Sequence, residues 1–228
     1  MTQFKVLVSW SSGKDSAWLV HTMRTTMPDY RLGALLTTVN ESAQRVAMHA
    51  VRTELLVAQA DAIGLPLWQV MIPSPCPNDV YERAMASAVA RAVDEQFTHV
   101  AFGDLFLEDI RKYRERQLAG TGLTPLFPLF GSDTTKLAQE MVAAGLRARV
   151  TCIDPRTLDR SIAGRDFDGT LLADLPASVD PCGERGEFHT FAYAGPMFAA
   201  PIAIESGIVV ERDGFVFADV LKAPAAAV

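Results

Sequence analysis

The sequence predicts an α/β fold with a Rossmann-like parallel sheet and a smaller C-terminal α+β subdomain. Short apolar runs rich in β-branched residues alternate with longer helical stretches up to about residue 154, which is the pattern of successive βαβ units. Beyond that point the alternation stops, and residues 208–220 alternate as two strands around Asp213-Gly214, a hairpin pattern. The 228 residues are 49% hydrophobic and 21% charged, which suits a well-packed globular core.

The individual elements follow from apolar periodicity and from the turn residues that bound each run. Expected strands lie over residues 4–9, 32–39, 66–72, 98–102 and 148–153. Expected helices lie over residues 17–27, 47–63, 81–96, 111–119 and 134–144. Residues 166–180 have the composition of a loop, and residues 181–187 are dense in glycine and charge. We place a boundary near residue 130, which separates a first domain over residues 1–130 from a subdomain over residues 131–228.

Composition argues against several classes of protein. The net charge of −6 disfavours non-specific binding to nucleic acid or to an anionic membrane. The N-terminal residues lack the sections of a signal peptide, and no apolar run approaches the roughly 20 residues that span a bilayer. Cys76, Cys152 and Cys182 show no CxxC spacing, so neither a disulfide framework nor a zinc ribbon is indicated. We therefore expect a cytoplasmic protein that binds neither membrane nor nucleic acid.

The loop that follows the first strand, residues 9–16, has the composition of a phosphate-binding turn. A turn that leaves a strand and opens a helix presents unpaired backbone N–H groups, and the helix dipole adds positive potential. Gly13 would let the backbone approach an anion, Lys14 adds a positive charge, and the serine hydroxyls can donate to phosphate oxygens. The GxxxxGK[ST] pattern of a Walker A loop is absent. The alternative is a polar turn that Ser12 or Asp15 caps.

Further polar residues stand at the carboxyl ends of other expected strands. Thr38 and Asn40 follow the second strand, and Gly103 and Asp104 follow the fourth. In open α/β sheets, ligands bind at these ends, near the point where the strand order reverses. The sequence therefore predicts a single site that combines these residues with the loop at residues 9–16. Asn40 or Asp104 could instead cap the segment that follows it.

Three segments resemble motifs of a known family. Residues 11–16, Ser-Ser-Gly-Lys-Asp-Ser, resemble the SGGKDS signature of N-type ATP pyrophosphatases, with Ser12 at a glycine position, where a serine fits if its φ is negative. Residues 103–115 resemble the GDI…R…E element of diphthine–ammonia ligase-like proteins, with Tyr113 where an arginine is usual. Residues 180–191 are similar to their DxCGENGEFHTF element, with Arg185 in place of asparagine.

Residues 125–130 also look like the PLxPLW segment of this family, so the resemblance runs from about residue 4 to residue 198 in the expected order. The chain is identified as a member of the diphthine–ammonia ligase-like family of N-type ATP pyrophosphatases. The resemblance implies a sheet of the adenine nucleotide alpha hydrolase type, with an ATP-binding first domain and a substrate-binding subdomain.

The resemblance also implies a reaction in two halves. A substrate carboxylate attacks the α-phosphorus of ATP and releases pyrophosphate, and ammonia then displaces AMP to form an amide. The implied cofactors are ATP and Mg²⁺. The implied substrate is diphthine on elongation factor 2, or a small carboxylate metabolite where the host makes no diphthamide. Both a monomer and a homodimer remain open.

The resemblance assigns roles to individual residues. The expected catalytic residues are Lys14, Asp15, Asp104, Glu184 and Glu187, with Asp15 as the candidate metal ligand. The expected nucleotide-binding residues are Ser9, Ser11, Ser12, Gly13, Lys14, Asp15, Ser16, Thr38, Asn40 and Gly103. The expected substrate-binding residues are His49, Arg111, Glu115, Gly183, Glu184, Gly186, Glu187 and His189. Arg111 and Glu115 could instead form a surface ion pair, and the two glutamates could be solvated.

Two other functions fit parts of the same pattern. One is a sulfur-transferring or tRNA-modifying ATP pyrophosphatase, which commonly carries cysteine pairs or a basic extension; the scattered cysteines and the acidic balance disfavour it. The other is a nucleotide-binding regulatory module without chemistry, which the lysine and the carboxylates disfavour. Release of pyrophosphate with candidate carboxylates would separate these alternatives.

Overall fold

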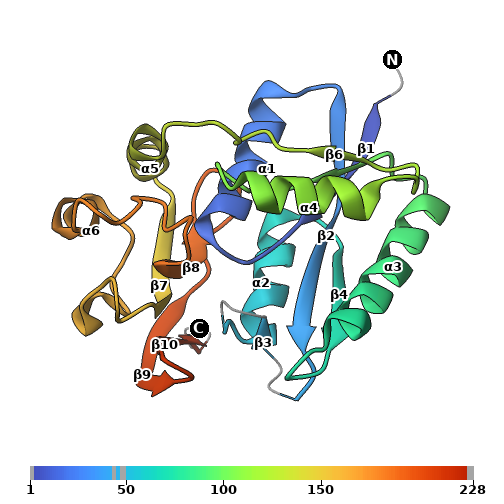
Figure 1. Cartoon of the computed structure of the whole chain (residues 1–228). Coiled ribbons are helices and arrows are strands. Elements are labelled where there is room, and N and C mark those ends of the chain that lie inside the picture. The colour runs from blue at the N-terminus through green and yellow to red at the C-terminus, as the bar shows by residue number, and fades with distance from the viewer. Residues whose placement is uncertain (1–2, 43–44, 47–49, 225–228) are drawn as a thin grey trace.

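The computed structural model describes residues 3–42, 45–46 and 50–224 and shows a mixed α/β chain built on two sheets (Figure 1). The larger sheet has six strands in the order β3-β2-β1-β5-β6, with β4 also paired to β2. Its strands are β1 Phe4–Ser9, β2 Tyr30–Asn40, β3 Arg45–Val46, β4 Leu67–Ile72, β5 His99–Ala101 and β6 Thr124–Leu126. All of its pairings are parallel except the one between β2 and β3. The parallel sheet expected from the sequence is confirmed.

The position of β1 creates the switch point of this sheet. The chain leaves β1 toward β2 and β4 on one side, and later adds β5 and β6 on the other side of β1. The loops that follow β1 and β5 therefore diverge, which opens a crevice at the carboxyl ends of these two strands. This crevice is where the strand-end residues were expected to meet.

Helices cover both faces of the sheet, because successive strand residues point to opposite faces. Val6 and Val8 of β1 pack into one group of buried side chains, and Leu7 packs into another. The first group includes residues of α1 (Lys14–Thr26) and α2 (Thr53–Ile63), and the second includes residues of α3 (Asn78–Asp94) and α4 (Glu108–Leu118). The helices α3 and α4 thus cover the same face of the sheet, and this face adjoins the crevice.

The second sheet is antiparallel, with the strand order β8-β7-β10-β9. Its strands are β7 Arg147–Ile153, β8 Phe188–Ala194, β9 Ile204–Arg212 and β10 Phe215–Lys222. The helices α5 (Thr134–Ala143) and α6 (Gly169–Asp174) and a 3₁₀ turn (Arg160–Ile162) accompany it. Its buried side chains join the group that holds α1 and α2, and Figure 1 shows the second sheet on that side of the molecule.

Several expected elements are confirmed and others are wrong in part. The first strand, the hairpin around Asp213-Gly214 and the helix at Thr134–Ala143 form as expected. The expected helix over residues 47–63 begins only at Thr53, because Arg45–Val46 pairs with β2 and Arg45 also bridges Arg52. Residues 47–49 lie outside the described residues.

Further differences involve both sheets. The strand expected over residues 148–153 lies in the antiparallel sheet, the segment expected as a loop over residues 166–180 contains α6, and β6 and β8 were not predicted. The boundary near residue 130 stays a prediction. Among the described residues, no helix has both the length and the apolar character that a membrane crossing requires.

Candidate functional site

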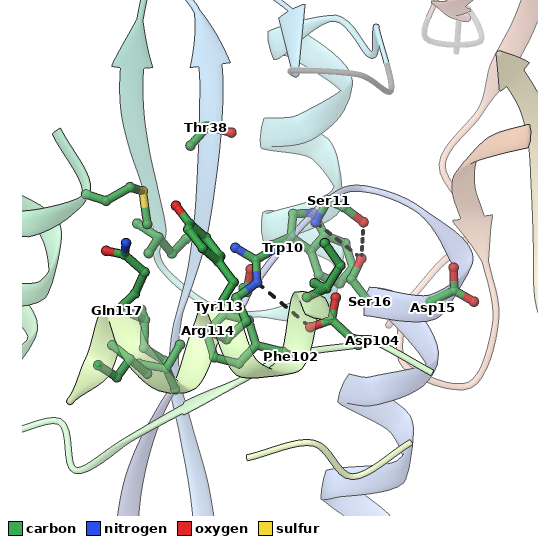
Figure 2. Close-up of a pocket in the computed structure, with 18 of the residues that line it drawn as sticks. Trp10, Ser11, Asp15, Ser16, Thr38, Phe102, Asp104, Tyr113, Arg114 and Gln117 are labelled. Atoms are coloured by element: carbon green, nitrogen blue, oxygen red, sulfur yellow. Dashed lines mark hydrogen bonds and ion pairs between the residues drawn. The ribbon is translucent and has the colours of Figure 1, made fainter. Parts of the chain in front are cut away.

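A cavity of about 1000 Å³ occupies the crevice at the carboxyl ends of β1, β2 and β5 (Figure 2). The start of α1, the faces of α3 and α4, and the loop before β8 complete its walls. Its volume is at the upper end of the range for small-molecule sites, which leaves room for more than one reactant. The cavity brings together four of the strand-end residues that the sequence placed in one site, Ser9, Thr38, Gly103 and Asp104.

The loop after β1 forms one end of the cavity, where Ser11 and Ser16 line the wall. The Ser11 and Ser16 hydroxyl oxygens lie 3.1 Å apart, and the Ser16 hydroxyl donates to the Gly13 carbonyl at 3.0 Å. The helix α1 begins at Lys14, so its first N–H groups and the positive end of its dipole lie at the same end of the cavity. This arrangement can hold an anion such as a phosphate.

Ser12 does not have the negative φ with which a serine fits a glycine position of the motif. Its φ is +70°, in the left-handed region, while Gly13 has a φ of −84° and an extended ψ of 173°. The backbone conformation that favours glycine is therefore at position 12 rather than at position 13. Ser12 is fully buried, and its hydroxyl has no hydrogen-bond partner within the described residues.

Lys14 is buried between the loop and the second sheet, with 2% of its surface exposed. Its ammonium group donates to the carbonyl of Cys182 and to the carboxylate of Asp15, the latter at 2.9 Å. Burial has the largest single effect and lowers the pKa of Lys14, but the combined effects of Asp15, Cys182 and Glu184 raise the pKa above its usual value. The positive charge is thus retained beside the cavity that Lys14 helps to line.

Two carboxyl groups in the cavity have raised pKa values. Burial raises the pKa of Asp104, against the opposing effect of Arg114. Burial also raises the pKa of Glu184 to about 7; the N–H group of Leu105, which donates to Glu184 at 2.7 Å, lowers it, and the charge of Asp15 adds to the rise. A carboxyl group with a pKa near neutral pH can accept and release a proton during a reaction.

Asp104 and Arg114 face each other from the end of β5 and from α4 (Figure 2). The Arg114 Nε and the Asp104 Oδ2 are 3.9 Å apart, which is too long for a hydrogen bond. Both atoms are buried without a hydrogen-bond partner within the described residues, as is Oδ1 of Asp15. Buried polar atoms without partners are costly, so these three atoms fit a polar ligand that the cavity would bind.

The carboxylates of Asp15 and Asp104 are candidate ligands for a magnesium ion. Among the described residues, no group of three or more His, Cys, Asp and Glu side chains is arranged to hold a metal ion. Mg²⁺ in phosphate-transfer sites is usually held by one or two carboxylates together with the phosphates and water. The free oxygens of Asp15 and Asp104 fit that partial donor set.

The loop before β8 brings Gly183 and Glu184 to the cavity, and β8 itself brings His189, but Glu187 does not line the cavity. Glu187 is 5% exposed and accepts hydrogen bonds from the N–H groups of Asp180 at 3.0 Å and of Arg185 at 2.9 Å. It therefore holds the shape of the loop. The arrangement offers no contact between Glu187 and a ligand in the cavity, which differs from the catalytic role expected for it.

The two glycines of this loop have left-handed backbones, with φ of +67° at Gly183 and +86° at Gly186. A Cβ at Gly183 would lie 2.8 Å from the Phe188 carbonyl oxygen, so the loop can close there only with glycine. Gly186 has no neighbour that a Cβ would meet, and it does not line the cavity. Glu184 is thus carried by a turn that the Gly183 backbone makes possible.

The strand-end residues divide between the cavity and its surroundings. Ser9, Thr38 and Gly103 line the cavity, and a Cβ at Gly103 would lie 3.3 Å from the backbone of Asp15. The glycine thus lets the end of β5 approach the first turn of α1. Asn40 lies outside the lining, and its side-chain oxygen accepts hydrogen bonds from the Ser42 backbone at 3.1 Å and hydroxyl at 2.9 Å.

Two of the expected substrate residues lie on the outside of α4. Arg111 and Glu115 pair at 3.0 Å with more than a third of each side chain exposed, and neither lines the cavity. Arg111 also lies over the ring of Phe130, 4.7 Å from its centre. This is the surface ion pair that the sequence left open. His49 lies outside the described residues.

The sequence did not indicate several residues that line the cavity from α4. Ile110, Arg114 and Gln117 share one face of this helix, Leu107 stands just before its first turn, and Figure 2 shows Arg114 and Gln117 with Tyr113 on the cavity side. Their spacing of three and four residues was a readable signal, because such residues lie on one helix face. No such spacing indicated Gln59 of α2, which lies outside the cavity lining and donates a hydrogen bond to the Ser12 carbonyl.

Comparisons with known proteins identify relatives of most of the chain. The family models described as Diphthamide synthase N-terminal domain and Diphthamide synthase C-terminal domain match residues 4–125 and 133–220. The chain is 26% identical over 193 residues to the diphthine–ammonia ligase of Bos taurus, covering 78% of this chain and 70% of that protein. It is 27% identical over 178 residues to that of Danio rerio, covering 71% of this chain and 69% of that protein.

Two further similarities cover less. The diphthine–ammonia ligase of Schizosaccharomyces pombe is 32% identical over 95 residues, which is 40% of this chain but only 16% of that longer protein. Among solved structures, a U34-tRNA thiolase NcsA from Methanococcus maripaludis aligns with a TM-score of 0.38 and 15% identity, over 58% of this chain and 55% of that one. A similarity this weak supports no conclusion about function.

Proposed function

The chain belongs to the diphthamide synthase family, and from this membership and the cavity we propose that it is an ATP-dependent amide-forming ligase. In the proposed reaction, a substrate carboxylate attacks the α-phosphorus of ATP and releases pyrophosphate, and ammonia then displaces AMP. The names of the relatives, diphthine–ammonia ligases, support the formation of a carbon–nitrogen bond. The observation that carries the proposal is the single cavity that joins an anion-binding loop to Glu184 and Asp104.

The loop end of the cavity suits the first half of this reaction. The start of α1, with the hydroxyls of Ser11 and Ser16, would bind the phosphates, and the buried ammonium of Lys14 would offset their negative charge. We assign the adenosine to the strand ends that Ser9, Thr38 and Gly103 provide. Ser12 and Gly13 would then act through their backbone, and the role of Asn40 would be indirect.

Glu184 suits the second half of the reaction. Ammonia must lose a proton as it forms the amide, and a carboxylate with a pKa of about 7 can take that proton near neutral pH. Asp104 and His189 line the same cavity and would help to position the acyl group and the incoming ammonia. Gly183 supports this arrangement through its backbone, and Glu187 would act only by holding the loop that carries Glu184.

A magnesium ion would complete the charge balance around the phosphates. Asp15 and Asp104 would hold it, because each offers a buried carboxylate oxygen without a partner in the described structure. Bound there, the ion would neutralise charge on the phosphates and make pyrophosphate a better leaving group.

The carboxylate substrate would be diphthine on elongation factor 2, as the names of the relatives indicate, or a small metabolite with a carboxyl group. We propose ammonia as the second reactant and a cytoplasmic location, and we leave a homodimer open.

The chemistry of the thiols disfavours sulfur transfer as a second function. Burial raises the pKa values of Cys152 and Cys182 to about 12, so neither supplies a reactive thiolate near neutral pH. The three cysteines, Cys76, Cys152 and Cys182, are all free in the described structure, and Cys152 and Cys182 are buried.

The proposed function is tested by the products formed from ATP. The purified chain, incubated with ATP, Mg²⁺, ammonium and a panel of carboxylates that includes a diphthine-bearing elongation factor 2, should form AMP and pyrophosphate in equal amounts with an acceptable carboxylate. Mass spectrometry should find the corresponding amide. Formation of ADP and phosphate, or tight ATP binding without turnover on any carboxylate, would contradict the proposal.

A further inference from the structure

Gln59 is a buried polar residue that the proposed chemistry does not use. It lies on α2, is fully buried, and has apolar neighbours such as Leu55, Leu56 and Ile63 on the same helix. A side-chain amide in such a place is costly unless all of its hydrogen-bonding groups find partners. Gln59 does not line the cavity, so it cannot contact a ligand there.

Both polar atoms of the Gln59 amide have hydrogen-bond partners. Its oxygen accepts a hydrogen bond from the Trp10 indole at 3.1 Å, and its nitrogen donates to the carbonyls of Ser12 at 2.9 Å and Ala192 at 2.6 Å. The orientation of the amide is fixed by its partners, because the indole can only donate and the two carbonyls can only accept. Gln59 of α2 thus joins the loop at residues 9–16, through Trp10 and Ser12, to Ala192 of β8.

The contact with Ser12 bears directly on the phosphate loop. The Ser12 carbonyl also accepts a hydrogen bond from the backbone N–H of Ala192 at 2.9 Å, so two donors fix its direction. Ser12 has a left-handed φ of +70°, which is unfavourable for a serine and needs such support. Without the support, the peptide after Ser12 would be free to rotate toward a more favourable conformation.

Fixing this carbonyl also fixes an N–H group. In a planar trans peptide, the carbonyl and the following N–H point in opposite directions. Since the Ser12 carbonyl points toward α2 and β8, the N–H of Gly13 points away from them. This N–H donates a hydrogen bond to the hydroxyl oxygen of Ser11, 3.4 Å away, and Ser11 lines the cavity.

We propose that Gln59 is a positioning residue that holds the Ser12–Gly13 peptide with the Gly13 N–H turned toward the phosphates of the nucleotide. This inference rests on the proposed function, because it assumes that the loop binds those phosphates. The inference adds to the proposed function that a residue outside the cavity determines the geometry of the loop. It also explains why β8 of the second sheet adjoins the loop, since Ala192 supplies the other donor.

Separate titrations with inorganic pyrophosphate and with adenosine test the proposal in the Gln59→Met variant. Methionine has a similar length and shape but cannot hold the Ser12 carbonyl. We expect pyrophosphate affinity to fall by about tenfold, the equivalent of one lost oriented hydrogen bond, while adenosine affinity stays within about twofold. Ile63→Val, which trims another buried side chain of α2, is the matched control and should change neither affinity.

The outcomes separate positioning from stability and from the proposed function. Pyrophosphate affinity within about twofold of the wild type in Gln59→Met, or an equal loss of adenosine affinity, would overturn the positioning role. Absence of pyrophosphate and ATP binding in the wild type would instead contradict the proposed function.

A measurement on the wild type keeps the proposal open to refutation if Gln59→Met fails to fold. In ¹⁵N-labelled protein, the Gly13 amide resonance should shift downfield as pyrophosphate is added, because its N–H would donate to a phosphate oxygen. An unchanged Gly13 resonance at saturating pyrophosphate would overturn the proposal.

Discussion

The two ends of the cavity are built differently. At the loop end, Ser12, Lys14 and Ser16 are each at most 3% exposed, and groups from α2 and β8 hold the loop in place. At the helix end, α3 buries only Ala88 and Ala92, although its side chains form much of the cavity wall. One end is therefore fixed by hydrogen bonds from distant segments, and the other is a looser apolar wall.

This difference matches the two kinds of reactant in the proposed reaction. Phosphates and a transferred proton need donors and charges at fixed positions, because binding groups that are already oriented need no rearrangement during the reaction. An apolar wall of half-buried side chains such as Met85 and Val89 can adjust to the shape of what it contacts. We expect substitutions at the loop end to have the largest effects and substitutions outside the cavity to have the smallest.

Lys14→Met should have the largest effect. The substitution removes the buried positive charge next to the phosphate site while it keeps most of the apolar length of the side chain. We expect AMP formation to fall by roughly 10²–10³-fold, as is typical when a group that stabilises developing charge is lost. The rate of AMP formation measures this, and circular dichroism checks the fold. Lys136→Met, with 77% of the lysine side chain exposed, is the control and should be fully active.

Glu184→Gln should have the next largest effect and should also change the pH dependence. In the wild type, amide formation should increase as the pH rises through about 7, because the carboxylate form accepts the proton. The variant should lack this inflection and react about 10²-fold more slowly. A pH–rate profile measures both, with the exposed Glu140→Gln as the control. An unchanged inflection in the Glu184 variant would assign the titration to another group.

The same substitution should change the dependence of stability on pH. The folded pKa of Glu184, about 7, lies above its ordinary value, so the folded state holds this proton more tightly than the unfolded state does. The free energy of unfolding therefore falls as the pH rises from the ordinary pKa of 4.5 to about 7, since ionisation places a charge in a buried site. Urea midpoints measured at about pH 5 and about pH 8 should differ less in the variant than in the wild type.

Ser12→Gly should stabilise the loop end by a smaller amount. Glycine adopts the left-handed φ of +70° without strain, although it also gives the unfolded chain more freedom. We expect a net gain of about 0.5–1 kcal/mol in the free energy of unfolding. Asp213→Gly, at a left-handed turn far from the cavity with φ of +54°, should give a similar gain and leave ATP binding unchanged. A loss of stability in Ser12→Gly would show that the serine makes a favourable contact.

Arg111→Ala should have the smallest effect. Arg111 forms an exposed pair with Glu115 outside the cavity lining, and such pairs contribute at most about 1 kcal/mol. Turnover should stay within about twofold of the wild type, measured as amide formed at limiting carboxylate. An increase of more than about twofold in the KM for the carboxylate would show that Arg111 contributes to substrate binding.

The sequence was sufficient to predict what depends on local pattern. Alternating strands and helices predicted the parallel sheet, and strand ends predicted that the loop at residues 9–16, Thr38 and Gly103 would meet. The motif at residues 180–191 predicted the family, which the matching family models confirm. These signals lie within short stretches, so they can be read without a structure.

The rest depends on contacts between distant residues. Gln59 bonds to carbonyls 47 and 133 residues away, and nothing in its own helix indicates these partners. The left-handed backbone of Ser12 is held by the same contacts, so it could not be predicted from the local sequence. Glu187 matched its motif, but only the folded loop reveals that its carboxylate is occupied by two backbone N–H groups.

The central claim is that a carboxylate is activated by attack on the α-phosphorus of ATP. It is tested most directly with a substrate carboxylate labelled with ¹⁸O, chosen from those that support AMP formation. If an acyl-adenylate forms, the AMP released after amide formation must carry one labelled oxygen, which mass spectrometry detects. Unlabelled AMP, or label found in inorganic phosphate together with ADP, would contradict the account.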